Sequence, residues 1–177
     1  MENALLEIMS SKMKHKEQVE IITALVESDQ TALAELFDTL KNGTDVQKGT
    51  AAEVMKFVSK EKPDMMVPYI GTLIEYIDYK APRVRWGCPE AIGNLASKYP
   101  REVEGAIPKL LENLNDTSTV VRWCAAFALT EIAKYNLGKQ DELVIIFRDL
   151  ITVEQNNGVR NVYIKALKDI EKRSLDC

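Results

Sequence analysis

The stretch that decides the fold is VVRWCAAFALTEIA, residues 120–133, because it repeats RVRWGCPEAIGNLA, residues 83–96. Both stretches contain the triplet Val-Arg-Trp, at residues 84–86 and 121–123. After each triplet, apolar and small residues recur at the spacing of one helix face. The two stretches therefore predict two equivalent amphipathic helices in a repeated structure.

Two weaker copies extend this repeat. Sliding the sequence against itself aligns Val46, Val84, Val121 and Val159, with steps of 38, 37 and 38 residues. A further amphipathic segment precedes each valine, at residues 30–41, 64–79, 101–115 and 140–152, and turn-forming residues such as Asn-Gly separate the segments. No alternating strand pattern is present. The sequence predicts an all-α fold, an α-solenoid of stacked antiparallel helix pairs with about 9–10 helices.

The repeats suggest how the chain is organised. At 177 residues, with no low-complexity linker, the chain is expected to form one repeat domain over residues 1–177. The four helix-pair repeats are expected at residues 30–62, 63–100, 101–138 and 139–177. Residues 1–29 lack the Val-Arg element and are predicted to form a degenerate capping helix pair, since terminal repeats need one solvated face.

Composition narrows the classes of function. The formal net charge is −4, which disfavours a protein whose main task is to neutralise phosphates. No apolar run approaches the length of a membrane span, and the first residues lack a signal-peptide core, so we expect a cytoplasmic protein without membrane contact. The cysteines at 88, 124 and 177 are interpreted as packed, reduced thiols. With His15 as the single histidine, we expect no metal site and no cofactor.

The third copy resembles a known family. IPKLLENLNDTSTVVRWCAAFALTEIAK, Ile107 to Lys134, is similar to a HEAT repeat, with a proline in the first helix, an Asp in the turn, then Val-Arg and an Ala-rich second helix. The resemblance covers residues 30–173, although the units are shorter than the usual period of about 40–47 residues. It implies a right-handed superhelix whose second helices line a concave side.

Within such a superhelix, one stripe of each second helix faces the concavity. The candidate partner-binding residues on this stripe are Trp86, Glu90, Trp123, Phe127, Asn161 and Lys165. Both tryptophans of the chain occupy the same repeat position. One interpretation is that each tryptophan packs over the preceding loop and closes the core. The other is that Trp86, Trp123 and Phe127 form an apolar floor for a partner's helix or extended segment, with Glu90 and Lys165 at its polar rim.

A second recurring feature is an arginine directly after the valine. Arg85, Arg122 and Arg160 each follow an acid by six or seven residues, and these acids are Asp78, Asp116 and Glu154. Pairs of this kind are predicted to form a structural ladder that ties adjacent repeats together. The first copy has Gln47 in this place, so the ladder is expected to lack its first rung.

Prolines are expected to disturb three helices. Pro68 and Pro108 are predicted to kink first helices. Pro89 lies in the second helix of the second repeat, where Arg83 to Cys88 are predicted to form a separate turn before the helix restarts.

No catalytic set, phosphate-binding loop or cofactor fingerprint is present in the sequence. We therefore expect a non-catalytic scaffold that binds a protein or peptide partner on its concave face. We further expect it to be a monomer or to self-associate weakly.

Two alternatives from other classes stay open. HEAT-like alkylpurine DNA glycosylases use concave tryptophans and an acid, an arrangement that Trp86 and Glu90 resemble, and lysines 165, 168 and 172 would then contact phosphates. The acidic balance and the Glu in place of Asp count against it, and we expect nucleic-acid binding to be absent. The second alternative is self-assembly through the exposed ends of the repeat array.

Overall fold

The computed structural model describes residues 4–175, and within this range every regular element is helical. The N-terminal elements are α1 (Ala4–Ser10), α2 (His15–Ser28), α3 (Gln30–Asn42) and α4 (Asp45–Glu61). The central elements are α5 (Pro63–Met66), the 3-10 helix η1 (Val67–Tyr69), α6 (Ile70–Glu75) and α7 (Pro82–Leu95). The C-terminal elements are the 3-10 helix η2 (Glu104–Ala106), α8 (Ile107–Asn113), α9 (Thr119–Tyr135), α10 (Leu137–Val153) and α11 (Asn157–Leu175). If α5, η1 and α6 are counted as one interrupted helix, and η2 as the first turn of α8, residues 4–175 hold ten helices. The fold is the predicted all-α solenoid.

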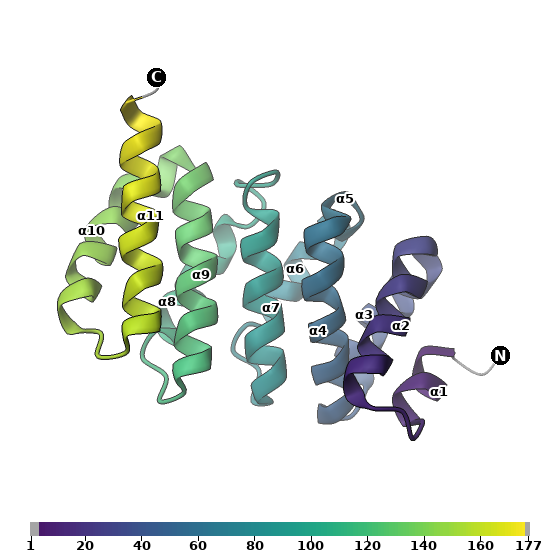
Figure 1. Cartoon of the computed structure of the whole chain (residues 1–177). Coiled ribbons are helices and arrows are strands. Elements are labelled where there is room, and N and C mark those ends of the chain that lie inside the picture. Colours follow the sequence, from purple (N-terminus) through teal and green to yellow (C-terminus); the bar gives the residue numbers. More distant parts are fainter. Residues whose placement is uncertain (1–3, 176–177) are drawn as a thin grey trace.

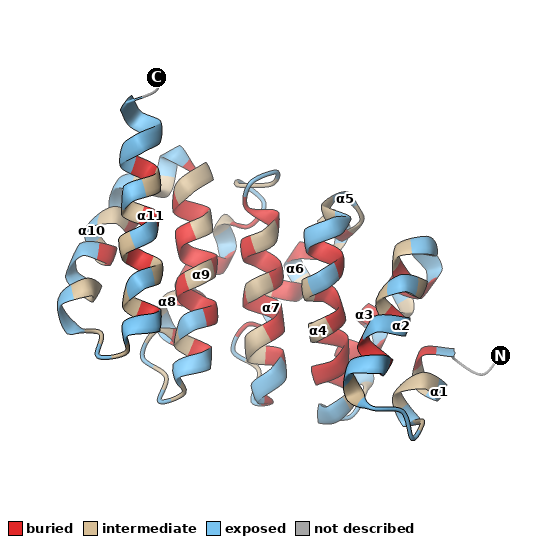
Figure 2. Cartoon of the chain, viewed as in Figure 1, coloured by how far each residue is buried: buried red, intermediate tan, exposed pale blue. Residues whose placement is uncertain are grey.

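The helices form two layers. Helices α2, α4, α7, α9 and α11 stand side by side in one row, and α3, α6, α8 and α10 lie behind them (Figure 1). Within the front row α4 packs on α7, α7 on α9 and α9 on α11, so that each second helix contacts its two neighbours. Buried residues run along the facing sides of these helices, whereas α10 and the end of α11 are largely exposed (Figure 2). Stacking of the pairs thus builds one continuous core, as expected for a repeat array.

Local sequence explains where the second helices begin. Ser118 caps α9 by accepting a hydrogen bond from the Val121 amide, and Asn156 accepts one from the Val159 amide at the start of α11. At α4, Thr44 and Gln47 form a reciprocal capping box. The turn residues therefore fix the starts of α4, α9 and α11, whereas α7 begins at Pro82 without a side-chain cap.

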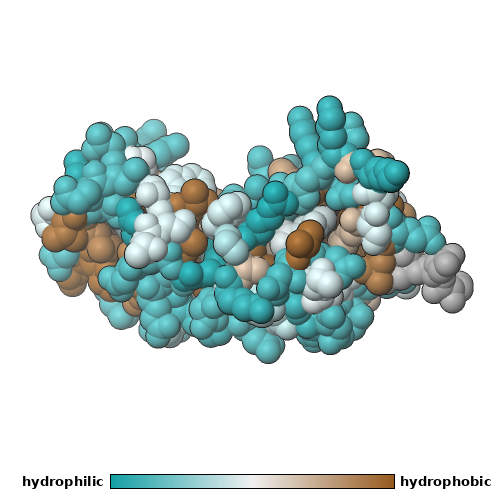
Figure 3. Space-filling model, turned by 90° about the horizontal axis from the view of Figure 1, so that it is seen from below, coloured by the Kyte–Doolittle hydropathy of each residue, from teal (hydrophilic) through white to brown (hydrophobic). Residues whose placement is uncertain are grey.

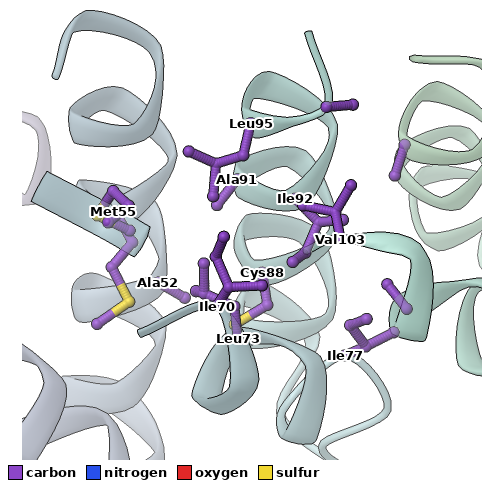
Figure 4. Packing of buried hydrophobic residues seen from close by; sticks show 14 of the residues in the cluster. Ala52, Met55, Ile70, Leu73, Ile77, Cys88, Ala91, Ile92, Leu95 and Val103 are labelled. Atoms are coloured by element: carbon purple, nitrogen blue, oxygen red, sulfur yellow. The ribbon is translucent and has the colours of Figure 1, made fainter. Parts of the chain in front are cut away.

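The interior is closely packed where second helices meet. A Cβ atom on Gly87 would lie 2.4 Å from the Ala52 carbonyl oxygen, and one on Gly93 would lie 2.6 Å from the Phe127 ring. Glycine at these two positions therefore lets α7 approach α4 on one side and α9 on the other. The close-up in Figure 4 shows Ala52 and Met55 of α4 beside Cys88, Ala91 and Leu95 of α7, above Ile70 and Leu73 of α6. Cys88 and Cys124 are buried free thiols, and Cys177 lies outside the described residues.

The alignment of the first copy was wrong by one residue. Val84, Val121 and Val159 are buried, but Val46 is 75% exposed. The residue of α4 that matches them is Gln47, which gives steps of 37, 37 and 38 residues (84 − 47, 121 − 84 and 159 − 121). In this register Met55 and Val58 take the buried positions of Ile92 and Leu95 in α7. Because the first copy has a valine directly before the true position, sequence alone favoured the wrong register.

The three prolines within predicted helices do not all interrupt them as expected. Pro89 lies inside α7, which is helical from Pro82 to Leu95, so the predicted separate turn and restart are absent. Pro68 falls in η1, between α5 and α6, where it interrupts the first helix. Pro108 stands in the first turn of α8, a position where a proline needs no amide hydrogen bond. Only Pro68 therefore breaks a helix in the expected way.

Candidate functional site

The predicted partner-binding residues lie on three neighbouring second helices. Trp86 and Glu90 lie on α7, Trp123 and Phe127 on α9, and Asn161 and Lys165 on α11. Viewed from below, the molecule is hollowed between its N-terminal and C-terminal ends (Figure 3). The predicted residues do not form one continuous aromatic surface. They divide into a polar pocket around Trp86, an aromatic pair on α9 and a charged segment on α11.

The pocket around Trp86 has a volume of about 240 Å³ and draws its walls from α2, α4, α7 and α9. Its lining residues are His15, Glu53, Lys56, Arg83, Trp86, Gly87, Glu90 and Val120. The Trp86 indole nitrogen is buried and has no hydrogen-bond partner within the described residues. An unpaired buried donor of this kind is rare in folded proteins, because it loses its hydrogen bond to water. Trp86 is therefore half-buried in a polar pocket and does not lie open as an apolar floor.

Glu90 forms the acidic side of this pocket. Burial raises the pKa of its carboxyl group, and the nearby Lys56 ammonium opposes this effect. Its Oε1 atom accepts a hydrogen bond from the Cys124 thiol of α9 at 3.6 Å. Glu90 thus bridges α7 and α9 through the weak thiol donor of Cys124.

The opposite wall of the pocket is formed by His15, Glu53 and Arg83, none of which was predicted as a site residue. The His15 Nε2 atom lies 2.7 Å from Glu53 Oε2 and 2.7 Å from Arg83 Nη1. This nitrogen either donates to the carboxylate or accepts from the guanidinium, depending on its protonation and tautomer. The three residues come from α2, α4 and α7, so they attach the N-terminal helix pair to the concave face. The correct register of α4 places Glu53 and Glu90 at equivalent positions, but no sequence pattern connects Glu53 with His15 and Arg83.

The aromatic pair on α9 consists of Trp123 and Phe127. Their ring centroids are 5.7 Å apart and the ring planes differ by 3°, so the two rings are stacked in parallel. Trp123 is 37% exposed, which is unusual for so large an apolar side chain in the middle of a helix row. Phe127 also packs against Gly93 of α7, which holds its ring in place.

The segment of α11 beside the aromatic pair is charged. Asn161 and Lys165 are exposed at the positions that Trp123 and Phe127 occupy in α9. Lys168 and Lys172 continue the same side of the helix and are also exposed. The character of the concave face therefore changes from aromatic to basic between α9 and α11.

The arginine ladder exists, but its partners differ from those predicted. Arg85 pairs with Asp116 of the following repeat at 2.6 Å and not with Asp78 of its own repeat. Arg122 pairs with Glu154 of the following repeat through two hydrogen bonds, of 3.0 and 3.2 Å. The pKa values of both carboxyl groups are lowered. At Asp116 the chief cause is the hydrogen bond from the Ser118 amide, to which Arg85 adds, and at Glu154 the chief cause is the hydrogen bond from Arg122. Each arginine therefore ties its repeat to the next one.

The ends of the ladder also differ from expectation. Arg160, in the last repeat of residues 4–175, donates to the Glu154 main-chain carbonyl of its own turn, as Arg122 does to that of Asp116. Asp78 pairs with Lys109 at 2.8 Å. In the corrected register the first rung is Lys48, not Gln47. The Lys48 ammonium is buried, donates to the main-chain carbonyls of Leu40 and Lys41, and faces the rings of Tyr76 and Tyr79 of the next repeat.

Residues 4–175 contain no group of three or more His, Cys, Asp or Glu side chains placed to hold a metal ion. No helix in the same range is long and apolar enough to cross a bilayer.

Repeated helix pairs, a continuous core and inter-repeat ion pairs define an α-solenoid. Residues 82–132 match the family model of the HEAT-like repeat, and these residues contain both copies of the Val-Arg-Trp triplet. The chain therefore has the α-solenoid fold that HEAT-like and armadillo repeat proteins share. A search of curated proteins gave no significant match.

Several solved structures with the same architecture are engineered proteins. One engineered protein is 18% identical, with a TM-score of 0.71 over 96% of this chain and 79% of its own. A designed armadillo repeat protein in complex with the peptide (KR)4 is 18% identical, with a TM-score of 0.70 over 95% and 81% of the two chains. Computationally designed armadillo repeat proteins for modular peptide recognition are 17% identical, with a TM-score of 0.69 over 94% and 81%. At these identities the similarity establishes the fold.

Proposed function

We propose that this protein is a non-catalytic scaffold that binds a segment of a protein partner, or a peptide, on its concave face. The observation that carries the proposal is the exposed Trp123–Phe127 pair beside the pocket of Trp86. Exposed, well-ordered aromatic side chains are the usual energetic anchors of protein interfaces. A preformed stack also loses little conformational freedom when a partner binds.

The fold supports this proposal, since several of its structural neighbours are designed peptide-binding armadillo proteins. Stacked repeats present an extended surface that suits an extended segment. The DNA-binding alternative gains no support from the matched structures. In addition, Glu90 is engaged with the Cys124 thiol across two helices.

The remaining parts of the proposal concern organisation and location. We propose the division into a capping pair, residues 1–29, and four repeats, and a protein that acts as a monomer or self-associates weakly. We propose a cytoplasmic location, with which the buried reduced thiols Cys88 and Cys124 agree.

A peptide selection tests the binding surface. A random peptide library displayed on phage is selected on the immobilised full chain, and the affinities of selected peptides are measured by fluorescence polarisation. Trp123→Ala/Phe127→Ala is expected to weaken binding about a hundredfold, since anchor residues carry most of the affinity.

A matched control removes exposed apolar side chains elsewhere. Leu137→Ala/Ile145→Ala alters α10, where these residues are 77% and 61% exposed, and is expected to leave the affinities unchanged. Thermal melts monitored by circular dichroism show whether both variants are folded. Equal binding by the wild type and the folded α9 variant would place the site elsewhere, and a selection without enriched peptides would contradict peptide binding.

A further inference from the structure

The lysine stripe of α11, defined as Lys165, Lys168 and Lys172, adjoins the aromatic pair. Helices α9 and α11 pack side by side, and Lys165 occupies the position of Phe127 one repeat later. All three lysines are exposed, and none has an ion-pair partner within residues 4–175. They differ in this from Lys134 of α9, which is paired with Glu131 and Asp169.

The acids near the lysine stripe leave its charge largely uncompensated. Glu131 and Asp169 are both engaged by Lys134, at 2.7 and 3.5 Å. Glu171 is exposed on α11, where Arg173 follows it two residues later. Residues 159–175 contain five basic residues, at 160, 165, 168, 172 and 173, and two acids, at 169 and 171, so this helix carries a net charge of +3 in a chain whose net charge is −4.

We infer that the partner segment on the concave face is an acidic peptide, with an apolar residue on the aromatic pair and carboxylates on the lysine stripe. This inference rests on the proposed function and names the chemistry of its partner. An anionic segment would be steered to the basic stretch of the concave face on α11 and held there by lysines that no acid within residues 4–175 engages. The stacked rings beside the stripe supply the apolar anchor that charge alone lacks.

The same selection tests the chemistry of the partner. Peptides enriched on the wild-type chain are expected to combine an aromatic or aliphatic residue with several Asp or Glu residues. Their affinity is expected to fall as salt rises, because rim charges are screened over about 10 Å at ordinary ionic strength. Lys165→Glu/Lys168→Glu/Lys172→Glu is expected to bind the selected peptides about tenfold more weakly and to select basic peptides instead.

A matched variant controls for total charge. Lys12→Glu/Lys41→Glu/Lys62→Glu changes the net charge equally at exposed lysines away from α11, and it is expected to retain the affinity for acidic peptides. Selection of basic or uncharged peptides by the wild type would overturn the inference and leave the proposed function standing. If duplex DNA bound with a steep salt dependence while acidic peptides did not, the inference would also be overturned. Failure to enrich any peptide would contradict the proposed function itself.

Discussion

Helices α7 and α9 carry the same Val-Arg-Trp triplet, yet the structure uses the two copies differently. In α7 the triplet is followed by Gly87 and Glu90, and Trp86 is drawn into a polar pocket with its indole nitrogen buried. In α9 the equivalent positions hold Cys124 and Phe127, and Trp123 stacks on Phe127 and is partly exposed. The difference shows that a repeated position fixes where a side chain starts, whereas its neighbours decide how far that side chain is buried.

The largest effect is expected at Gly87 of α7, where α9 has the larger Cys124. Gly87→Ala is expected to destabilise the protein by about 3 kcal/mol, since the added carbon would overlap the Ala52 main chain of α4. Chemical denaturation measures the change. The matched control is Gly71→Ala in α6, where a Cβ would meet nothing within 4 Å, and a gain of about 0.5–1 kcal/mol is expected there. Equal effects at both glycines would show that α4 and α7 are not in close contact.

The next largest effects on stability are expected when the ladder arginines of the two copies, Arg122 and Arg85, are replaced. Arg122→Ala is expected to cost about 2 kcal/mol, because it leaves the Glu154 carboxylate, 9% exposed, without the two hydrogen bonds from the guanidinium. Arg85→Ala is expected to cost about half as much, since Arg85 and Asp116 are more exposed, at 24% and 17% against 18% and 9% for Arg122 and Glu154. A double-mutant cycle between Arg122 and Glu154, measured by chemical denaturation, gives their coupling energy. A coupling near zero would mean that the pair does not connect the repeats.

The pH dependence of stability provides an independent measure of the pair formed by Arg122 and Glu154. Arg122 lowers the pKa of Glu154, so the unfolded chain binds this proton more tightly than the native state does. The stabilisation is therefore present above the ordinary pKa of about 4.5 and is lost as the pH falls through the lower native pKa. Melting temperatures between neutral pH and about pH 3 are expected to fall less steeply for Glu154→Gln than for the wild type. A parallel decline of the two proteins would contradict this account.

Smaller differences in stability and in fluorescence quenching are expected between the two tryptophans. Acrylamide is expected to quench Trp123 more strongly than Trp86, when each is measured alone in the Trp86→Phe and Trp123→Phe variants. Trp86→Ala is expected to cost about 1 kcal/mol more in stability than Trp123→Ala, because more of its side chain is removed from water. The reverse order in either measurement would place Trp86, not Trp123, at the open surface.

The smallest effect is expected at Glu90, the α7 counterpart of Phe127. Burial raises its pKa, so the native state binds the proton more tightly than the unfolded chain, and stability falls as the pH rises through the window above the ordinary value of 4.5. Glu90→Gln is expected to raise the melting temperature slightly at neutral pH and to have no effect in acid below that window. Glu53→Gln occupies the same position one repeat earlier, where His15 engages the carboxylate, and no gain is expected there. A loss of stability in Glu90→Gln would show that the charged carboxylate is needed.

The architecture was predictable from the sequence because burial follows the period of the helix. Val84, Val121 and Val159 are buried as their spacing predicts. Sequence places the first copy one residue too early, because Val46 precedes Gln47 directly and, as the more apolar residue, matches the valines of the other copies better. Helix geometry corrects this, since a shift of one residue turns each side chain by about 100° around the axis.

The site was less predictable, because its contacts join segments far apart in the chain. The pairing of Arg85 with Asp116 depends on how far one repeat reaches towards the next, and spacing within one copy does not contain this information. The wall formed by His15, Glu53 and Arg83 joins three helices and has no sequence pattern of its own. Pro89 stayed within α7, although local propensity favours a break, since the packing of a helix on its neighbours can outweigh the loss of one hydrogen bond.

The direction of the ladder has a consequence for the length of the array. Arg85 and Arg122 each bind an acid of the following repeat, and Arg160 binds the carbonyl of Glu154 in its own turn. This own-turn contact does not prevent forward pairing, because Arg122 donates to the Asp116 carbonyl of its own turn and to the Glu154 carboxylate at the same time. The guanidinium of Arg160 is thus already held as that of Arg122 is, and an artificially added repeat would need an acid at the position of Glu154 to continue the ladder.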